Sequence, residues 1–242
     1  MIISSFITIA LILFVASFLQ GLTGFGFALI SMPLLSLIID IREAIPLCAI
    51  FGLLISLYLM YQLKDHVIVF ELKRLIVGAL VGIPIGVYFL AHTGPVLLQT
   101  ILAIIIITFV TLTLSGILKP IGLDRKWGYL FGSLSGILGG AFNTGGPPVL
   151  VYVYLQGWDK NKQKASLSGY FVVTAAFVVV SHAITGITTL HTLSYLLYFL
   201  PFVLFGLMFG SRLFNRISSG IYSKMVLIGL LGIGLFTISR TF

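Results

Sequence analysis

The sequence predicts an all-α polytopic membrane protein that consists of two inverted repeats, each with a glycine-broken helical hairpin followed by three transmembrane helices. The prediction rests on the composition, on a series of apolar stretches and on a glycine motif that occurs in both halves. Of the 242 residues, 59% are hydrophobic and 8% are charged, and the mean hydropathy is +1.19. Because soluble domains carry about 25% charged residues, this composition excludes a cytosolic enzyme, a disordered protein and a conventional nucleic-acid binder.

The apolar stretches give the expected helices in order. A helix that crosses a bilayer needs about 20 apolar residues. Two stretches, 1–39 and 128–157, are apolar but interrupted by glycine. The second is too short for two complete crossings, so we expect a hairpin of shortened helices that meet inside the bilayer. Uninterrupted spans are expected at 43–61, 75–91, 95–118, 165–186, 190–211 and 222–240.

The basic residues predict how these spans are oriented. The net charge is +8, and all but two of the fourteen lysines and arginines fall in four loops separated by two passes each. These residues are Lys64, Lys73, Arg74, Lys119, Arg125, Lys126, Lys160, Lys162, Lys164, Arg212, Arg216 and Lys224. The positive-inside rule makes these loops cytoplasmic and solvated, and Arg42 and Arg240 are the exceptions. We therefore expect a multi-pass inner-membrane protein with both termini outside. The first 39 residues lack the positive segment of a cleavable signal peptide.

A duplicated motif divides the chain into two halves. Each half contains a Gly-x-x-Gly pair followed by proline at the same spacing. The matching residues are Gly21, Gly24 and Pro33 in the first half and Gly136, Gly139 and Pro148 in the second. We place the first repeat at 1–118, a cytoplasmic linker at 119–126 and the second repeat at 127–242. An odd number of crossings in each half inverts the copies, as in secondary transporters whose site lies where broken helices meet.

A second set of glycines has the spacing of close helix packing. Gly78, Gly82 and Gly86 recur every four residues, which lets two membrane helices approach closely. Their counterparts in the second half are Phe202, Gly206 and Gly210.

The hairpin tips are the candidate binding site. A cluster of glycine and proline between Gly139 and Pro148 ends a helix rather than packing one. A half-helix that begins inside the membrane directs free N–H groups and the positive end of its dipole at a cavity, which suits an anion. For Thr23 and Thr144, helix capping is an equal and compatible interpretation. The candidate substrate-binding residues are Gln20, Gly21, Thr23, Gly24, Gly26, Ser135, Gly139, Gly140, Asn143, Thr144, Gly145 and Gly146.

No pattern of residues predicts catalysis, a metal or a cofactor. Spans without a central carboxylate argue against a proton relay or a cation carrier, and Cys48 is the single cysteine. We expect His92, His182 and His191 near the outer surface, with His182 hydrogen-bonded.

These hairpin motifs resemble those of the sulfite exporter family of the TauE/SafE type, also called the 4-toluenesulfonate uptake permeases. The resemblance rests on Gly21-Leu-Thr-Gly-Phe-Gly-Phe-Ala and on Gly136-Ile-Leu-Gly-Gly-Ala-Phe-Asn-Thr-Gly-Gly-Pro-Pro, and it covers nearly the whole chain. It implies an inner-membrane transporter of sulfite, sulfoacetate or a related sulfonate. Phe25 stands where the second motif has a second glycine, so this ring either lines the cavity or packs.

Taken together, these features predict a secondary transporter that works by alternating access around a midplane anion site. Export is favoured because an inside-negative potential drives an anion outward. The expected partners are a small organosulfur or sulfite anion and the lipid bilayer, without nucleic acid, and a homo-oligomer is compatible with the sequence. Two alternatives stay open: an anion channel on the same fold, and a membrane scaffold or accessory subunit without flux of its own.

Overall fold

The computed structural model describes residues 2–63, 69–116, 119–158 and 160–213, and these residues form nine α-helices and no strand. The span expected at 222–240 lies outside the described residues. Six helices are long and apolar enough to cross a membrane. They are α1 (Ile2–Thr23), α3 (Ile41–Leu63), α4 (Val69–His92), α5 (Pro95–Leu114), α8 (Lys160–Ile184) and α9 (Leu190–Leu213).

Three shorter helices complete two hairpins. The first pairs α1 with α2 (Phe27–Leu35), and the second pairs α6 (Trp127–Phe142) with α7 (Gly146–Leu155). At 1.5 Å per residue, α2 and α7 are roughly 14 and 15 Å long, about half of a hydrocarbon core of roughly 30 Å. The expectation of a shortened hairpin is thus confirmed for α6 and α7. In the first hairpin only α2 is shortened, because α1 has 22 residues and can span the core by itself.

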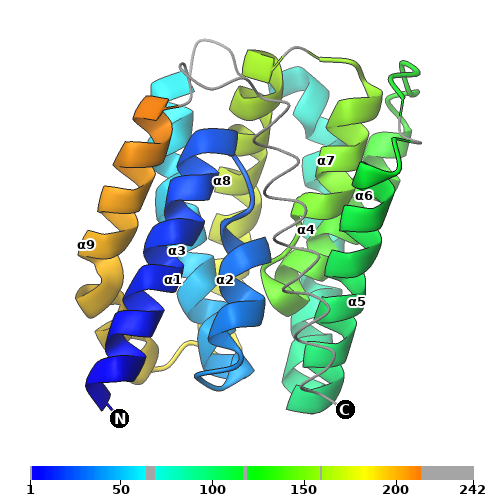
Figure 1. Cartoon of the computed structure of the whole chain (residues 1–242). Coiled ribbons are helices and arrows are strands. Elements are labelled where there is room, and N and C mark those ends of the chain that lie inside the picture. The colour runs from blue at the N-terminus through cyan, green and yellow to red at the C-terminus, as the bar shows by residue number, and fades with distance from the viewer. Residues whose placement is uncertain (1, 64–68, 117–118, 159, 214–242) are drawn as a thin grey trace.

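The helices pair crosswise between the two halves of the chain. In Figure 1, α1 lies along α9 on one side of the bundle, and α4 lies along α6 on the other. Between these two pairs, α3 packs against α8. By their order in each half, α1, α3 and α4 correspond to α6, α8 and α9. Exchanging the two sets turns the α1–α9 pair into the α6–α4 pair and leaves the α3–α8 pair unchanged. This symmetry agrees with the inverted-repeat interpretation.

Glycines set the spacing within both pairs. A Cβ atom on Gly78, Gly82 or Gly86 of α4 would lie 2.1–2.2 Å from a carbonyl oxygen of α6. The same holds in the other direction for Gly132, Gly136 and Gly140 of α6, at 2.1–2.4 Å from carbonyl oxygens of α4. Between α1 and α9 the corresponding glycines are Gly21, Gly206 and Gly210. The expected close packing is confirmed, with six glycines in the α4–α6 contact and three in the α1–α9 contact.

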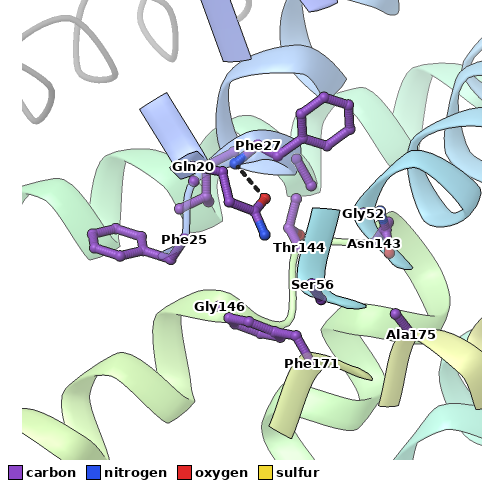
Figure 2. A pocket seen from close by; sticks show the side chains of 13 residues that line it. Gln20, Phe25, Phe27, Gly52, Ser56, Asn143, Thr144, Gly146, Phe171 and Ala175 are labelled. Atoms are coloured by element: carbon purple, nitrogen blue, oxygen red, sulfur yellow. Dashed lines mark hydrogen bonds between the residues drawn. The ribbon is translucent and has the colours of Figure 1, made fainter. Parts of the chain in front are cut away.

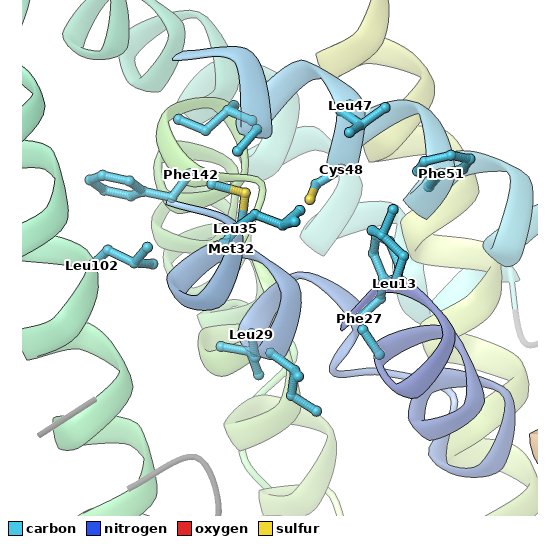
Figure 3. Close-up of a cluster of buried hydrophobic side chains, with 14 of the residues drawn as sticks. Leu13, Phe27, Leu29, Met32, Leu35, Leu47, Cys48, Phe51, Leu102 and Phe142 are labelled. Carbon is cyan, nitrogen blue, oxygen red and sulfur yellow. The ribbon is translucent and has the colours of Figure 1, made fainter. Parts of the chain in front are cut away.

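The largest apolar core lies around the first hairpin. Figure 3 shows Met32 and Leu35 of α2 against Cys48 of α3, with Leu102 of α5 and Phe142 of α6 nearby; all five side chains are buried. Since α2 is surrounded by protein, its broken backbone is kept away from lipid, as a membrane interior requires.

Helix ends next to the basic segments lie at one end of the bundle. The C-terminal ends of α3 and α5 and the N-terminal ends of α4, α6 and α8 lie at the top of Figure 1, while the N-terminus of the chain lies at the bottom. Arg42, an exception to the charge pattern, is at the opposite end. Its guanidinium donates a hydrogen bond to the Thr93 carbonyl oxygen at 2.9 Å, which ties the start of α3 to the turn between α4 and α5.

Candidate functional site

The first hairpin tip is a tight turn that satisfies most of its own polar groups. Gly24 and Gly26 have φ angles of +86° and +101°, a region that L-residues with a side chain rarely adopt. The Thr23 hydroxyl lies 2.8 Å from the Leu19 carbonyl oxygen and 2.7 Å from that of Phe25. Thr23 therefore stabilises the turn from the end of α1, and it does not cap the start of α2, whose N-cap residue is Gly26.

Gln20 connects this turn to the start of α2. Its Oε1 accepts a hydrogen bond from the backbone N–H of Phe27 at 3.3 Å, in a buried position. The amide nitrogen then points away from Phe27 and toward Thr144 (Figure 2). One side chain thus caps α2 and presents a donor to the space between the tips.

The second hairpin tip reverses the chain at Asn143. This residue has φ +54° and ψ +17°, the left-handed conformation that asparagine tolerates better than most residues. Its N–H donates to the Gly139 carbonyl oxygen at 2.9 Å, which closes the end of α6. Pro147 and Pro148 then occupy the first turn of α7, where proline is favoured because N–H groups lack partners there.

A hydrogen-bonded chain fixes the start of α7. The Ser135 hydroxyl donates to the Gly145 carbonyl oxygen and accepts a hydrogen bond from the Tyr170 hydroxyl at 2.8 Å. A Cβ atom on Gly145 would lie 2.6 Å from the Ser135 carbonyl oxygen. Ser135 and Gly145 therefore position the tip, and the Ser135 hydroxyl already has its partners within the protein.

The two tips meet at a cavity of about 60 Å³. The N-terminal ends of α2 and α7 both border it, at Phe27 and Gly146 (Figure 2). Thr144 is 1% exposed, and its Oγ1 has no hydrogen-bond partner. Because a buried hydroxyl without a partner is unfavourable, this group is available to a bound molecule.

A second cavity of about 40 Å³ lies beside the second hairpin. It shares Asn143, Phe171 and Ala175 with the first cavity. Asn143 thus borders both spaces, and Gly52 of α3 leaves room for its side chain: a Cβ on Gly52 would lie 3.5 Å from the Asn143 amide nitrogen.

The structure divides the twelve candidate residues into three groups. The larger cavity is lined by Gln20, Gly26, Asn143, Thr144 and Gly146. The smaller one is lined by Ser135, Gly139, Gly145 and again Asn143. The remaining four, Gly21, Thr23, Gly24 and Gly140, line neither cavity. Gly21 and Gly140 instead pack against backbone, since a Cβ there would lie 2.6 Å and 2.4 Å from carbonyl oxygens of α9 and α4.

Sequence reasoning missed part of the lining. Gly52 and Ser56 of α3 border the larger cavity, and both are small residues in an otherwise apolar span, a signal that was present. Phe171 and Ala175 of α8 gave no such signal, because an aromatic or an alanine is ordinary in a membrane helix. Phe25 borders the cavity and also packs against the apolar core around the first hairpin, so both interpretations of its ring apply.

Two side chains of α8 bind the hairpins from outside the cavities. Lys164 is 3% exposed, and its Nζ donates to the Gly21 carbonyl oxygen at 2.9 Å. The expectation that the whole 159–164 loop is solvated is therefore wrong for Lys164. Near the other end of α8, the Nε2 of buried His182 lies 3.0 Å from the Gly140 carbonyl oxygen. Each contact satisfies a carbonyl near the end of α1 or α6.

The chemistry of the site is that of neutral donors. None of the described residues that line the two cavities is charged. Within the described part of the chain, no group of histidine, cysteine, aspartate and glutamate is arranged to hold a metal ion. The arrangement can bind a small polar or anionic molecule through amides, hydroxyls and helix ends.

Comparison with known protein families matches residues 9–237 to the family described as sulfite exporter TauE/SafE. The chain belongs to this family. Membership places this TauE/SafE protein among membrane transporters of sulfur-containing anions, and it agrees with the expectation that the chain is not an enzyme. Six apolar helices make it a multi-pass membrane protein in contact with lipid. No curated protein and no solved structure matches the chain.

Proposed function

We propose that this TauE/SafE protein exports a small sulfur-containing oxyanion, such as sulfite, sulfoacetate or a related sulfonate, by alternating access around the cavity between the hairpin tips. The observation that carries the proposal is the meeting of two half-helix N-termini with the unpartnered Thr144 hydroxyl at one cavity. The first N–H groups of a helix lack intrahelical partners and carry partial positive charge. In α2 the backbone bonds begin with the Ile30 N–H and the Gly26 carbonyl oxygen.

The donors suit an oxyanion better than a cation. Gln20 presents its amide nitrogen, Thr144 a hydroxyl and Gly146 the start of a helix. Glycine at the tip lets a ligand approach the backbone closely. Asn143 borders both cavities, so it can contact a ligand that moves from one to the other.

Direction follows from the membrane potential. With the basic loops in the cytoplasm of an inner membrane and the termini outside, an inside-negative potential drives an anion outward by about 2.3 kcal/mol per charge per 100 mV. Export then needs no coupling ion. Movement of one repeat, or part of it, against the other would expose the site alternately to each side.

The experiment is flux of sulfite, sulfoacetate and sulfate into proteoliposomes under an imposed potential. We expect saturable, potential-driven movement of at least one of these anions. Thr144→Val should reduce it about tenfold, because a hydrogen bond to a charged group contributes about 1.5–3 kcal/mol. Thr100→Val is the matched control, since this hydroxyl bonds the Val96 carbonyl oxygen on α5, away from both cavities.

The alternatives give different results in the same preparation. A channel would give unitary currents and no saturation at low substrate. A scaffold or accessory subunit would give no flux under any gradient, and wild-type flux in Thr144→Val would contradict the assigned site.

A further inference from the structure

The cavity between the tips offers dipoles but no full positive charge. Its polar side chains are those of Gln20, Ser56, Asn143 and Thr144. The end of α2 adds backbone N–H groups, and the end of α7 adds that of Gly146, since Pro147 and Pro148 have none. Every one of these groups is neutral. A bound anion is therefore in direct contact with dipoles and with no charged side chain.

The buried lysine and histidine of α8 are not part of the cavity lining. Lys164, Phe171, Ala175 and His182 lie on one face of α8, because they follow one another at intervals of seven or four residues. Phe171 and Ala175 line the cavities, whereas Lys164 and His182 line neither. Both direct a nitrogen to a hairpin carbonyl oxygen, that of Gly21 or that of Gly140.

Charge enters the binding energy in two different ways. The free energy lost when an ion leaves water rises with the square of its charge, whereas its attraction to fixed dipoles rises only in proportion to the charge. Burying a charge without a paired counter-charge is therefore costly, and the imbalance is greater for a dianion than for a monoanion. A neutral site that binds a monoanion well should bind an isosteric dianion poorly.

From this we infer that the cavity selects monoanionic oxyanions: hydrogen sulfite and small monovalent sulfonates, in preference to the sulfite dianion and sulfate. The inference rests on the proposed function, because it concerns the same cavity and the same transport. Three phenylalanines, Phe25, Phe27 and Phe171, also border the cavity. These apolar side chains supply no counter-charge for a dianion.

The test compares anions of fixed and variable charge in proteoliposomes of the full chain. Methanesulfonate is a monoanion and sulfate a dianion from neutral to alkaline pH, whereas hydrogen sulfite converts to sulfite over that range. We expect at least tenfold faster flux of methanesulfonate than of sulfate at equal concentration and potential. At constant total sulfite, flux should fall as pH rises, while methanesulfonate flux stays constant, after subtraction of leakage into protein-free liposomes.

Two results would overturn the inference while leaving the proposed function intact: sulfate flux equal to that of methanesulfonate, or sulfite flux that rises with pH. Absence of flux for all three anions would instead overturn the proposed function, and the selectivity with it.

A gain-of-charge variant tests the same physics in the opposite direction. Phe25→Lys exchanges a large side chain in the turn for a cation of similar size beside the cavity, and Phe25→Leu is the neutral control. We expect Phe25→Lys to raise the ratio of sulfate to methanesulfonate flux at least tenfold over Phe25→Leu. An unchanged ratio in correctly folded Phe25→Lys would contradict selection by charge, and the wild-type comparison decides the matter if that variant does not fold.

Discussion

The two hairpin tips have matching sequence motifs but different hydrogen-bond chemistry. At the first tip, the Thr23 hydroxyl is used within the turn and the Gln20 oxygen caps α2. At the second tip, the Thr144 hydroxyl is buried at the cavity without a partner. The first tip therefore contributes mainly shape, an aromatic ring and one amide nitrogen, whereas the second contributes the donor that is free to bind a ligand.

The tips also differ in how their helices are held. Six glycines bring α6 and α4 into backbone contact, and three do so for α1 and α9. The end of α1 is additionally bonded by Lys164. We infer that close packing holds both hairpins and that a charged side chain additionally holds the first. Four predictions test these differences between the tips.

The largest effect is expected for Gly136→Ala. The new Cβ would lie 2.3 Å from the Ala79 carbonyl oxygen, which is backbone that cannot move aside easily. Overpacking of this kind costs about 1–3 kcal/mol or more, so thermal unfolding in detergent should occur at a clearly lower temperature. Gly21→Ala, at the matching position of the first hairpin, should be milder, since its nearest atom lies 2.6 Å away. Gly94→Ala is the control because its Cβ would meet nothing within 4 Å; equal melting of all three would refute the packing argument.

Lys164→Met should have the next largest effect. It removes a buried charge-assisted hydrogen bond to the Gly21 carbonyl oxygen, a kind of contact that contributes about 1.5–3 kcal/mol. The melting temperature should fall, and Lys119→Met, at an exposed position, should leave it unchanged. If Lys164→Met and Lys119→Met have the same melting temperature, the first hairpin is not held by Lys164.

The two threonines should separate transport from stability. Thr144→Val removes a hydroxyl that has no protein partner, so flux should fall while the melting temperature is maintained. Thr23→Val removes hydrogen bonds within the turn, so stability should fall by about 1 kcal/mol with less effect on flux in folded protein. If Thr144→Val instead lowered the melting temperature and Thr23→Val lowered flux, the roles of the two tips would be reversed.

The smallest effect is expected for Tyr170→Phe. This change deletes the hydrogen bond to the Ser135 hydroxyl and preserves the ring, at a cost of about 1 kcal/mol. Because Ser135 keeps its bond to the Gly145 carbonyl oxygen, flux should fall less than in Thr144→Val. A loss of flux equal to that of Thr144→Val would mean that Tyr170 itself takes part in binding.

Much of the fold follows from the sequence because membrane physics leaves few choices. Apolar length predicted the spans, and Gly78, Gly82 and Gly86 predicted close packing, since only glycine permits the backbone contact that α4 makes with α6. The repeat motif located both hairpins, because a cluster of glycine and proline favours a helix end, even though single prolines lie inside α2, α3, α4 and α9.

The rest of the site depends on contacts between distant segments. Gly21 and Gly140 have the same local signature as Gly26 and Gly146, but neighbouring helices occupy their open sides. The sequence predicts that Lys164 is a solvated loop residue. It is buried instead, and it donates a hydrogen bond to a carbonyl oxygen 143 positions earlier in the chain. Such long-range partners leave no periodicity or spacing to detect.

The most direct test asks whether one anion protects both tips. Cysteine is introduced at Gln20 or at Thr144 in a chain with Cys48→Ala, and labelling by a maleimide is followed against rising concentrations of an anion that gives saturable flux. The account predicts that both positions are protected as the anion concentration rises, with higher concentrations needed in Thr144→Cys because it lacks the binding hydroxyl, whereas Thr100→Cys on α5 is not protected. Protection at one tip only, or at neither, would contradict an anion site shared between the two hairpins.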